Sequence, residues 1–134
     1  MASIFTKIIK REIPAHIVAE NDHCIAFLDI NPLVLGHTLV VPKKEVDYIF
    51  DLDDETLTAL HLFAKQVALG IGRVIPCERV GVSVIGLEVP HTHVHLIPMD
   101  SADDLNFTRP KLKPKPEQLK AVAEQIRQAI GSQG

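Results

Sequence analysis

The stretch His91-Thr92-His93-Val94-His95-Leu96-Ile97 carries three of the chain's seven histidines, and they alternate with apolar or β-branched residues. This period of two predicts a strand over residues 91–97, with all three imidazoles on one face and the alternate residues packed on the other. Pro90 and Pro98 flank the run. Because proline cannot donate to an interior ladder, we expect the strand to lie between them. The row of imidazoles indicates a working surface.

Length and composition limit the class of protein. With 134 residues, 46% hydrophobic and 23% charged, the chain is predicted to form one globular domain over residues 1–134. No apolar run approaches the ~20 residues of a membrane helix, and the N-terminus becomes charged at Lys7, too early for a signal sequence. We therefore expect a cytoplasmic protein without a membrane partner. A net charge of −3 disfavours nucleic-acid binding, although small anionic ligands remain open.

Hydrophobic periodicity predicts the other elements. Strands are expected over residues 16–20, 24–29, 38–42, 79–85 and 91–97. Helices are expected over residues 3–11, from the acidic segment at 51–55 to Val74, and from Pro116 to Gly131. Residues 102–115 carry prolines and lysines, and are predicted to form an extended surface strap with its lysines in solvent. Residues 102–134 would thus be a C-terminal strap and helix.

Three functions could explain the histidine row. It could be an exposed polar face with a structural role. It could bind a metal ion, but the outer pair on a strand would be roughly 13 Å apart, so two histidines would need another ligand such as His37. The third function is nucleophilic catalysis, in which one neutral imidazole attacks phosphorus and its neighbours donate hydrogen bonds to phosphoryl oxygens. This chemistry predicts a phosphate ester or amide as the substrate.

At these residues the sequence resembles the histidine triad family, whose signature is three histidines alternating with hydrophobic residues. The resemblance covers residues 3–98. It rests on the triad and on blocks at residues 4–9, 12–14, 26–32 and 36–43. It implies an α+β fold in which a five-stranded antiparallel sheet with two main helices forms a nucleotide pocket. It also implies a homodimer with a sheet that continues across the interface.

The resemblance assigns roles to individual residues. His93 would be the nucleophile, and His91 and His95 would contact phosphate oxygens and assist the leaving group. His37 would approach the nucleophile from the neighbouring strand. Asp29 would bind the ribose hydroxyls, because a carboxylate can accept two hydroxyl hydrogen bonds. A purine would lie among the apolar residues Ile4, Phe5, Ile8, Ile13, Phe27 and Leu28.

Several positions depart from the family pattern. Leu87 stands where many relatives have glutamine, the loop over residues 83–90 is short, and its expected asparagine is absent. Glu88 stands where a small hydroxyl residue often contacts phosphate, so it would either repel the substrate or hold His91 protonated. We expect the second role. Some bacterial relatives have zinc-binding cysteines where this chain has Ser3 and Thr6, so we predict no metal and no cofactor.

These observations predict a nucleotidyl hydrolase or transferase acting on purine nucleoside phosphoramidates or related nucleotidyl compounds. A P–N or P–O bond at the α-phosphate would break through a covalent nucleotidyl intermediate on His93. The alternative is a purine-nucleotide-binding or interaction module with little turnover, because of the changes at Leu87 and Glu88. Apolar surface on the strand at residues 79–85 and on the helix before it predicts a homodimer.

Overall fold

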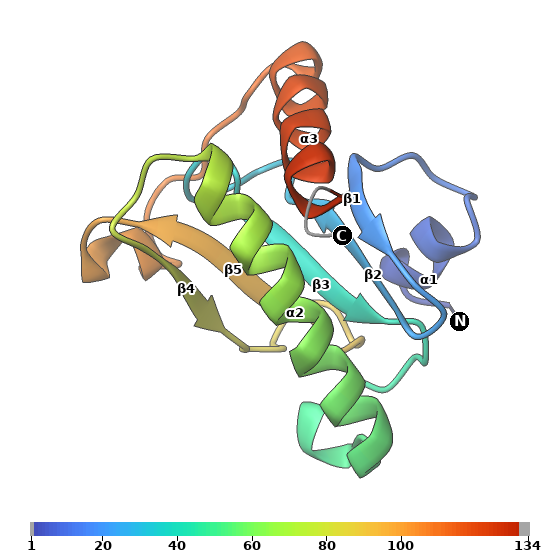
Figure 1. Cartoon of the computed structure of the whole chain (residues 1–134). Helices are drawn as coiled ribbons and strands as arrows, with labels where there is room; N and C mark the ends of the chain where they lie inside the picture. The colour runs from blue at the N-terminus through green and yellow to red at the C-terminus, as the bar shows by residue number, and fades with distance from the viewer. Residues whose placement is uncertain (1, 132–134) are drawn as a thin grey trace.

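Five strands pair antiparallel in the order β1-β2-β3-β5-β4 (Figure 1). The computed structural model describes residues 2–131. The strands are β1 (Ile17–Glu20), β2 (Cys24–Leu28), β3 (Thr38–Pro42), β4 (Arg79–Ser83) and β5 (Val94–Met99). The helices are α1 (Ile4–Ile9), α2 (Asp54–Val74) and α3 (Pro116–Gly131), with short 3-10 turns η1 (Ile49–Asp51) and η2 (Ala102–Leu105). The predicted α+β antiparallel sheet is confirmed.

Each face of the sheet has its own apolar core. In β2, Cys24, Ala26 and Leu28 join the core under α2 and α3, whereas Ile25 and Phe27 join the core that contains α1. This division follows from the period of two, which sends successive side chains to opposite faces. Figure 1 shows α2 crossing the first face. The second face is only partly covered by the short α1, which leaves room there for a site.

The two main helices begin and end close to the predicted positions. The Asp53 side chain caps α2 by accepting the Thr56 N–H at 2.7 Å. Gly70 lies where α2 meets α3: a Cβ added there would be 2.5 Å from the Ile130 side chain. Gly70 therefore allows the two helices to approach closely.

Among residues 2–131, no helix is both long enough and apolar enough to cross a membrane.

The short helix α1 packs against the sheet through one side and leaves Ile4 largely exposed. Ser3 is the N-cap, because its Oγ accepts the Thr6 N–H at 3.1 Å. The buried residues of α1 are Phe5 and Ile8, which are three positions apart and share one face. Ile4, predicted to line the purine pocket, is 51% exposed. Its side chain lies at the rim of an apolar cavity and not in the core.

The start of β5 corrects the prediction for the histidine row. The strand begins at Val94, so His91 and His93 precede it. The Thr92 N–H donates to the carbonyl of Val46 at 2.7 Å, which binds this segment to the loop after β3. The three histidines are therefore not one flat row, because the first part of the segment is bent away from the ladder.

The end of β5 also extends past the predicted limit, through Pro98 to Met99. Pro98 pairs with Val80 of β4, whereas the pairing of β5 with β3 ends at Leu96. The missing N–H of proline thus leaves no β3 acceptor without a partner, which explains why proline is tolerated here.

Candidate active site

Two cavities on the α1 face meet at Asp29, just after β2. The first, of about 260 Å³, is lined by five of the predicted site residues: Asp29, His37, Glu88, His93 and His95. The second, of about 190 Å³, is mainly apolar and is lined by all six residues predicted to surround a purine: Ile4, Phe5, Ile8, Ile13, Phe27 and Leu28. Asp29 lines both cavities. The arrangement suits a ligand with a flat apolar end and a polar end.

Strand pairing brings His37 to His95. In the ladder between β3 and β5, Leu39 lies opposite His95, and His37 immediately precedes β3. The His37 Nε2 atom lies 2.9 Å from His95 Nδ1. Residues 58 positions apart in the chain thus form one hydrogen-bonded pair at the floor of the first cavity.

The hydrogen-bond partners of this pair fix its protons. The backbone N–H of Leu33 donates to His37 Nδ1 at 3.1 Å, so in neutral His37 the proton is on Nε2. That Nε2–H donates to His95 Nδ1, and neutral His95 therefore carries its proton on Nε2. Burial is the main cause that lowers the pKa of His37 to about 3 and that of His95 to about 4. At pH 7 His95 is therefore a neutral hydrogen-bond donor.

His93 has the opposite tautomer. Its Nδ1 lies 2.8 Å from the carbonyl oxygen of His91, and a carbonyl can only accept, so Nδ1 carries the proton. The lone pair is then on Nε2. The ring packs edge-on against Phe5 and His95, with centroids 5.0 and 4.9 Å away. These contacts hold a nucleophilic nitrogen in a fixed orientation beside the first cavity.

His91 lies outside the first cavity, which corrects the role predicted for it. Its Nε2–H donates to the carbonyl of Pro42 at 2.8 Å, and its Nδ1 accepts from the Ser3 hydroxyl at 2.7 Å. The ring is fully buried, and both nitrogens are occupied. His91 therefore has no nitrogen available for a phosphate oxygen. Its place is structural, because it ties α1 and β3 to the carbonyl that orients His93.

The same contacts correct the role expected for Glu88. The carboxylate near His91 is that of Glu45, whose Oε1 lies 3.9 Å from His91 Nδ1. This Glu45 oxygen also accepts from the Ser3 N–H at 2.7 Å and from the Thr6 hydroxyl at 2.5 Å. Glu88 instead lines the first cavity, where its charge raises the pKa of Asp29 in addition to the larger effect of burial.

Asp29 is partly buried between the cavities. Its Oδ1 accepts the Asn31 N–H at 2.9 Å, and its Oδ2 lies 3.8 Å from His37 Nε2. Burial raises the pKa of the carboxyl group. Because Oδ1 already accepts the Asn31 N–H, Oδ2 has the greater remaining capacity to accept hydrogen bonds from hydroxyls at the junction of the two cavities.

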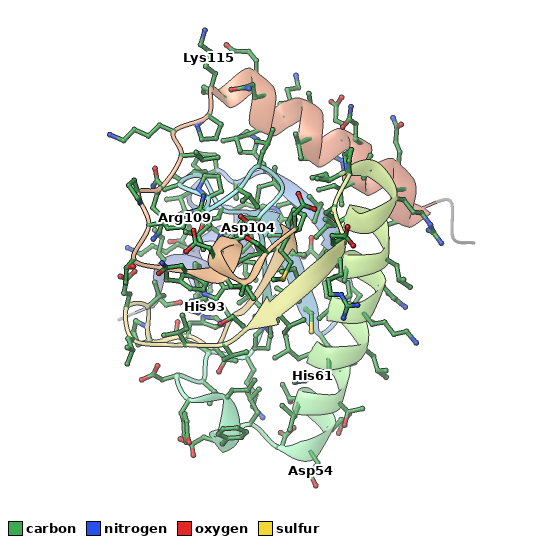
Figure 2. The ribbon with its side chains drawn as sticks, turned by 90° about the vertical axis from the view of Figure 1, so that its left-hand side faces the viewer. Asp54, His61, His93, Asp104, Arg109 and Lys115 are labelled. Atoms are coloured by element: carbon green, nitrogen blue, oxygen red, sulfur yellow. The ribbon has the colours of Figure 1, made fainter. Side chains whose placement is uncertain are left out.

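Two residues of the strap also line the first cavity, and the sequence did not predict them. They are Phe107 and Lys111. The Phe107 ring packs edge-on against His95, with centroids 4.7 Å apart, and approaches His37 at 6.2 Å. Figure 2 shows this side of the molecule, with His93 and, in the strap, Arg109 labelled. The sequence held one signal for this part of the site. Aromatic residues are rare in the chain, with five phenylalanines and one tyrosine, and yet Phe107 lies within the strap.

The described residues 2–131 contain no group of three or more histidine, cysteine, aspartate or glutamate side chains arranged to hold a metal ion. Ser3 and Thr6 occupy the positions compared above with zinc-binding cysteines. Ser3 hydrogen-bonds to His91, and Thr6 hydrogen-bonds to Glu45.

Comparison with known proteins gives consistent matches. The model of the HIT domain matches residues 10–102. An uncharacterized HIT-like protein of Borreliella burgdorferi is 37% identical over 92% of this chain and 94% of its own length. Adenosine 5′-monophosphoramidase hnt1 of Schizosaccharomyces pombe is 34% identical over 97% of this chain and 99% of its own length.

Solved structures agree with the sequence matches. A HIT-like protein from Bartonella henselae superposes with a TM-score of 0.82, at 32% identity, over 95% of each chain. A Zn-bound histidine triad family protein from Mycobacterium smegmatis has a TM-score of 0.84 at 23% identity, over 99% of this chain and 96% of that one, and shares the fold. The domain match, the identities and the geometry of His37, His93 and His95 together show that the chain belongs to the histidine triad family.

Proposed function

We propose that the protein is a nucleotidyl hydrolase or transferase acting on purine nucleoside phosphoramidates or related nucleotidyl compounds. The observation that carries the proposal is the pair of tautomers in the first cavity: a bare Nε2 on His93 beside an Nε2–H on His95. The name of the fission-yeast relative, adenosine 5′-monophosphoramidase, supports a P–N bond as one target and adenosine as the nucleoside.

In the proposed reaction, the lone pair of His93 Nε2 attacks the α-phosphorus. A P–Nε2 bond forms as the bond to the leaving nitrogen breaks, and the amine departs with a proton taken from solvent. The Nε2–H of His95 donates a hydrogen bond to a phosphoryl oxygen and stabilises its developing charge. Water then attacks phosphorus and gives a proton to solvent, the P–Nε2 bond breaks with its electron pair returning to His93 Nε2, and a nucleoside monophosphate is released.

The second cavity supports the choice of a purine nucleoside. Its polar edge is Asp29 and its wall is apolar, so a base could be buried while the ribose hydroxyls donate to the carboxylate. The ribose would then lie between the base and the phosphoryl group, in the same order as the apolar cavity, Asp29 and the histidine cavity along the surface.

Rapid-mixing mass spectrometry with adenosine 5′-phosphoramidate tests the covalent step. We expect a transient adduct of one adenylyl group, located on His93 by proteolysis, followed by free AMP. The variant His93→Gln should form neither adduct nor product. The matched control is His61→Gln, which changes an exposed histidine of α2 that lines neither cavity, and it should react like the parent protein.

The alternative function, nucleotide binding with little turnover, is favoured by one observation. Glu88 and Asp29 both line the first cavity, and two carboxylates disfavour an anionic phosphoryl group. AMP that binds to the protein, in the absence of any His93 adduct or product from the phosphoramidate, would support this alternative and contradict the enzymatic proposal.

We also propose that two chains pair through β4 and α2. β4 is an edge strand of the sheet, and Val82 on it is 58% exposed. Leu62 and Leu69 of α2 are exposed as well, which is unusual for large apolar side chains close to an unpaired edge. Sedimentation should give a dimer at micromolar concentration. A monomer under these conditions would contradict the proposal.

A further inference from the structure

We propose that Lys111 is a phosphate-binding residue, which the strap over residues 102–115 brings to the cavity of His93 and His95. The inference rests on the proposed function, because it names the positive charge that would hold the phosphoryl group of the same substrate. It concerns a segment beyond residue 102, where the match to the family domain ends.

The strap is attached to the body of the protein before and after Lys111. Before it, Arg109 Nη1 forms an ion pair with Asp104 Oδ1 of η2 at 3.0 Å, and Asp104 Oδ2 accepts the N–H of Asp100, which follows β5, at 2.8 Å. After it, the Leu112 N–H donates to the carbonyl of Pro32, in the loop before His37, at 2.8 Å. Lys111 lies between these two attachments. Its backbone position is therefore set by the fold, unlike that of a lysine in a free tail.

The Lys111 side chain is also directed by local contacts. Its Nζ donates to the carbonyl of Phe107 at 2.5 Å and lies 5.8 Å from the centroid of the Phe107 ring. The same ring packs against His95. Lys111 thus holds its ammonium group beside the aromatic residue that closes one side of the histidine cavity.

The charges around the cavity show why a cation is needed there. Low pKa values keep His37 and His95 neutral at pH 7, and the two acidic side chains, Asp29 and Glu88, are unfavourable to an anion. Among the described residues that line this cavity, Lys111 is the only lysine or arginine. Neutral imidazoles can donate hydrogen bonds to phosphate, but Lys111 alone of these residues supplies a full positive charge.

The charge of Lys111 acts on the residues of the site. Burial and His93 lower the pKa of His95, and Lys111 acts in the same direction. At Asp29, where burial raises the pKa, the charge of Lys111 opposes this effect. A cation close enough to influence a histidine and a carboxyl group on the cavity wall is close enough to attract a phosphoryl anion between them.

Calorimetric binding of AMP and of adenosine separates this role from a structural one. In Lys111→Gln, we expect AMP affinity to fall about tenfold and adenosine affinity to stay unchanged, because only AMP carries the anion. Lys111→Arg should keep most of the AMP affinity. The matched control is Lys113→Gln, a change to a lysine two residues further along the strap that does not line the cavity. It should bind both ligands like the parent protein.

Each other outcome overturns the inference in a recognisable way. Unchanged AMP affinity in Lys111→Gln, with normal AMP binding by the parent, would overturn it and leave the proposed function intact. An equal loss for AMP and adenosine would assign Lys111 to the structure of the strap. An equal loss of AMP affinity in Lys113→Gln would indicate a diffuse effect of net charge. A parent protein that binds neither ligand would contradict the proposed function, and the inference with it.

Discussion

Mild acid should weaken the fold, because His37 and His95 are buried as neutral imidazoles. Burial lowers the pKa of His37 to about 3 and that of His95 to about 4, whereas an unfolded histidine has a pKa near 6.5. Between these values the unfolded chain binds protons that the folded chain does not. The free energy of unfolding therefore falls as the pH drops below about 6.5. For His95 the loss continues to about pH 4, and for His37 to about pH 3.

The expected magnitude follows from the unfolded state alone. At pH 5.5, protonation stabilises an unfolded histidine of pKa 6.5 by RT ln(1 + 10), or about 1.4 kcal/mol. A folded histidine with a pKa near 4 or below gains almost nothing at this pH. The pair thus contributes about 3 kcal/mol of destabilisation between pH 8.0 and 5.5, which is a large part of the stability of a typical domain.

Urea unfolding at pH 8.0 and 5.5 measures this difference. His37→Gln removes one titrating group, and its amide can still accept from the Leu33 N–H and donate to His95. We expect its pH dependence to be smaller than that of the parent by about 1.4 kcal/mol. The control His61→Gln changes an exposed histidine. The raised pKa of Asp29 acts in the opposite sense, so the comparison is made between variants that all retain Asp29. A pH dependence in His37→Gln equal to that of the parent would refute the reasoning.

Three further substitutions test the site. His91→Leu should lower the free energy of unfolding by about 1–3 kcal/mol in urea, because the Ser3 hydroxyl and a buried carbonyl lose their partner; an unchanged urea midpoint would contradict this. Glu88→Ser should lower KM for adenosine 5′-phosphoramidate at similar kcat, because a carboxylate leaves the cavity; a fall in kcat alone would show that Glu88 assists catalysis. Phe5→Leu should weaken adenosine binding about fivefold in calorimetry, because the aromatic wall of the base cavity is lost; unchanged affinity would place the base elsewhere.

The elements that the sequence predicted well are those with a regular burial pattern. β3 matches its predicted range, residues 38–42, because it is the middle strand of the sheet and all five of its residues are buried. The boundaries of α3 were predictable from Pro116 and Gly131, which have local conformational preferences. The bounds of β5 were not, because they depend on where its neighbours β3 and β4 end, and this is a property of the sheet as a whole.

The candidate site was predictable wherever one motif carried the chemistry. The tautomer of His93 follows from a carbonyl two residues earlier in the chain, so its position beside the cavity needs only local structure. The place of His91 needs long-range structure, because its partners, Ser3 and Pro42, are 88 and 49 positions away. The period of two made these histidines look equivalent. Their hydrogen bonds leave Nε2 of His93 without a proton beside the cavity and occupy both ring nitrogens of His91.

The strap shows why composition alone did not place Lys111 at the cavity. Three lysines and several prolines over residues 102–115 are typical of a solvated segment, and most of these side chains are indeed exposed. What brings Lys111 to the cavity is a backbone hydrogen bond to Pro32 and an ion pair of Arg109, and neither leaves a periodic pattern in the sequence. Because Lys111 lies beyond the matched residues 10–102, substitutions in the strap would change the charge of the cavity while the three histidines and the sheet stay the same. Under the proposed function, selectivity for the phosphoryl group would then depend on a segment outside the matched residues 10–102.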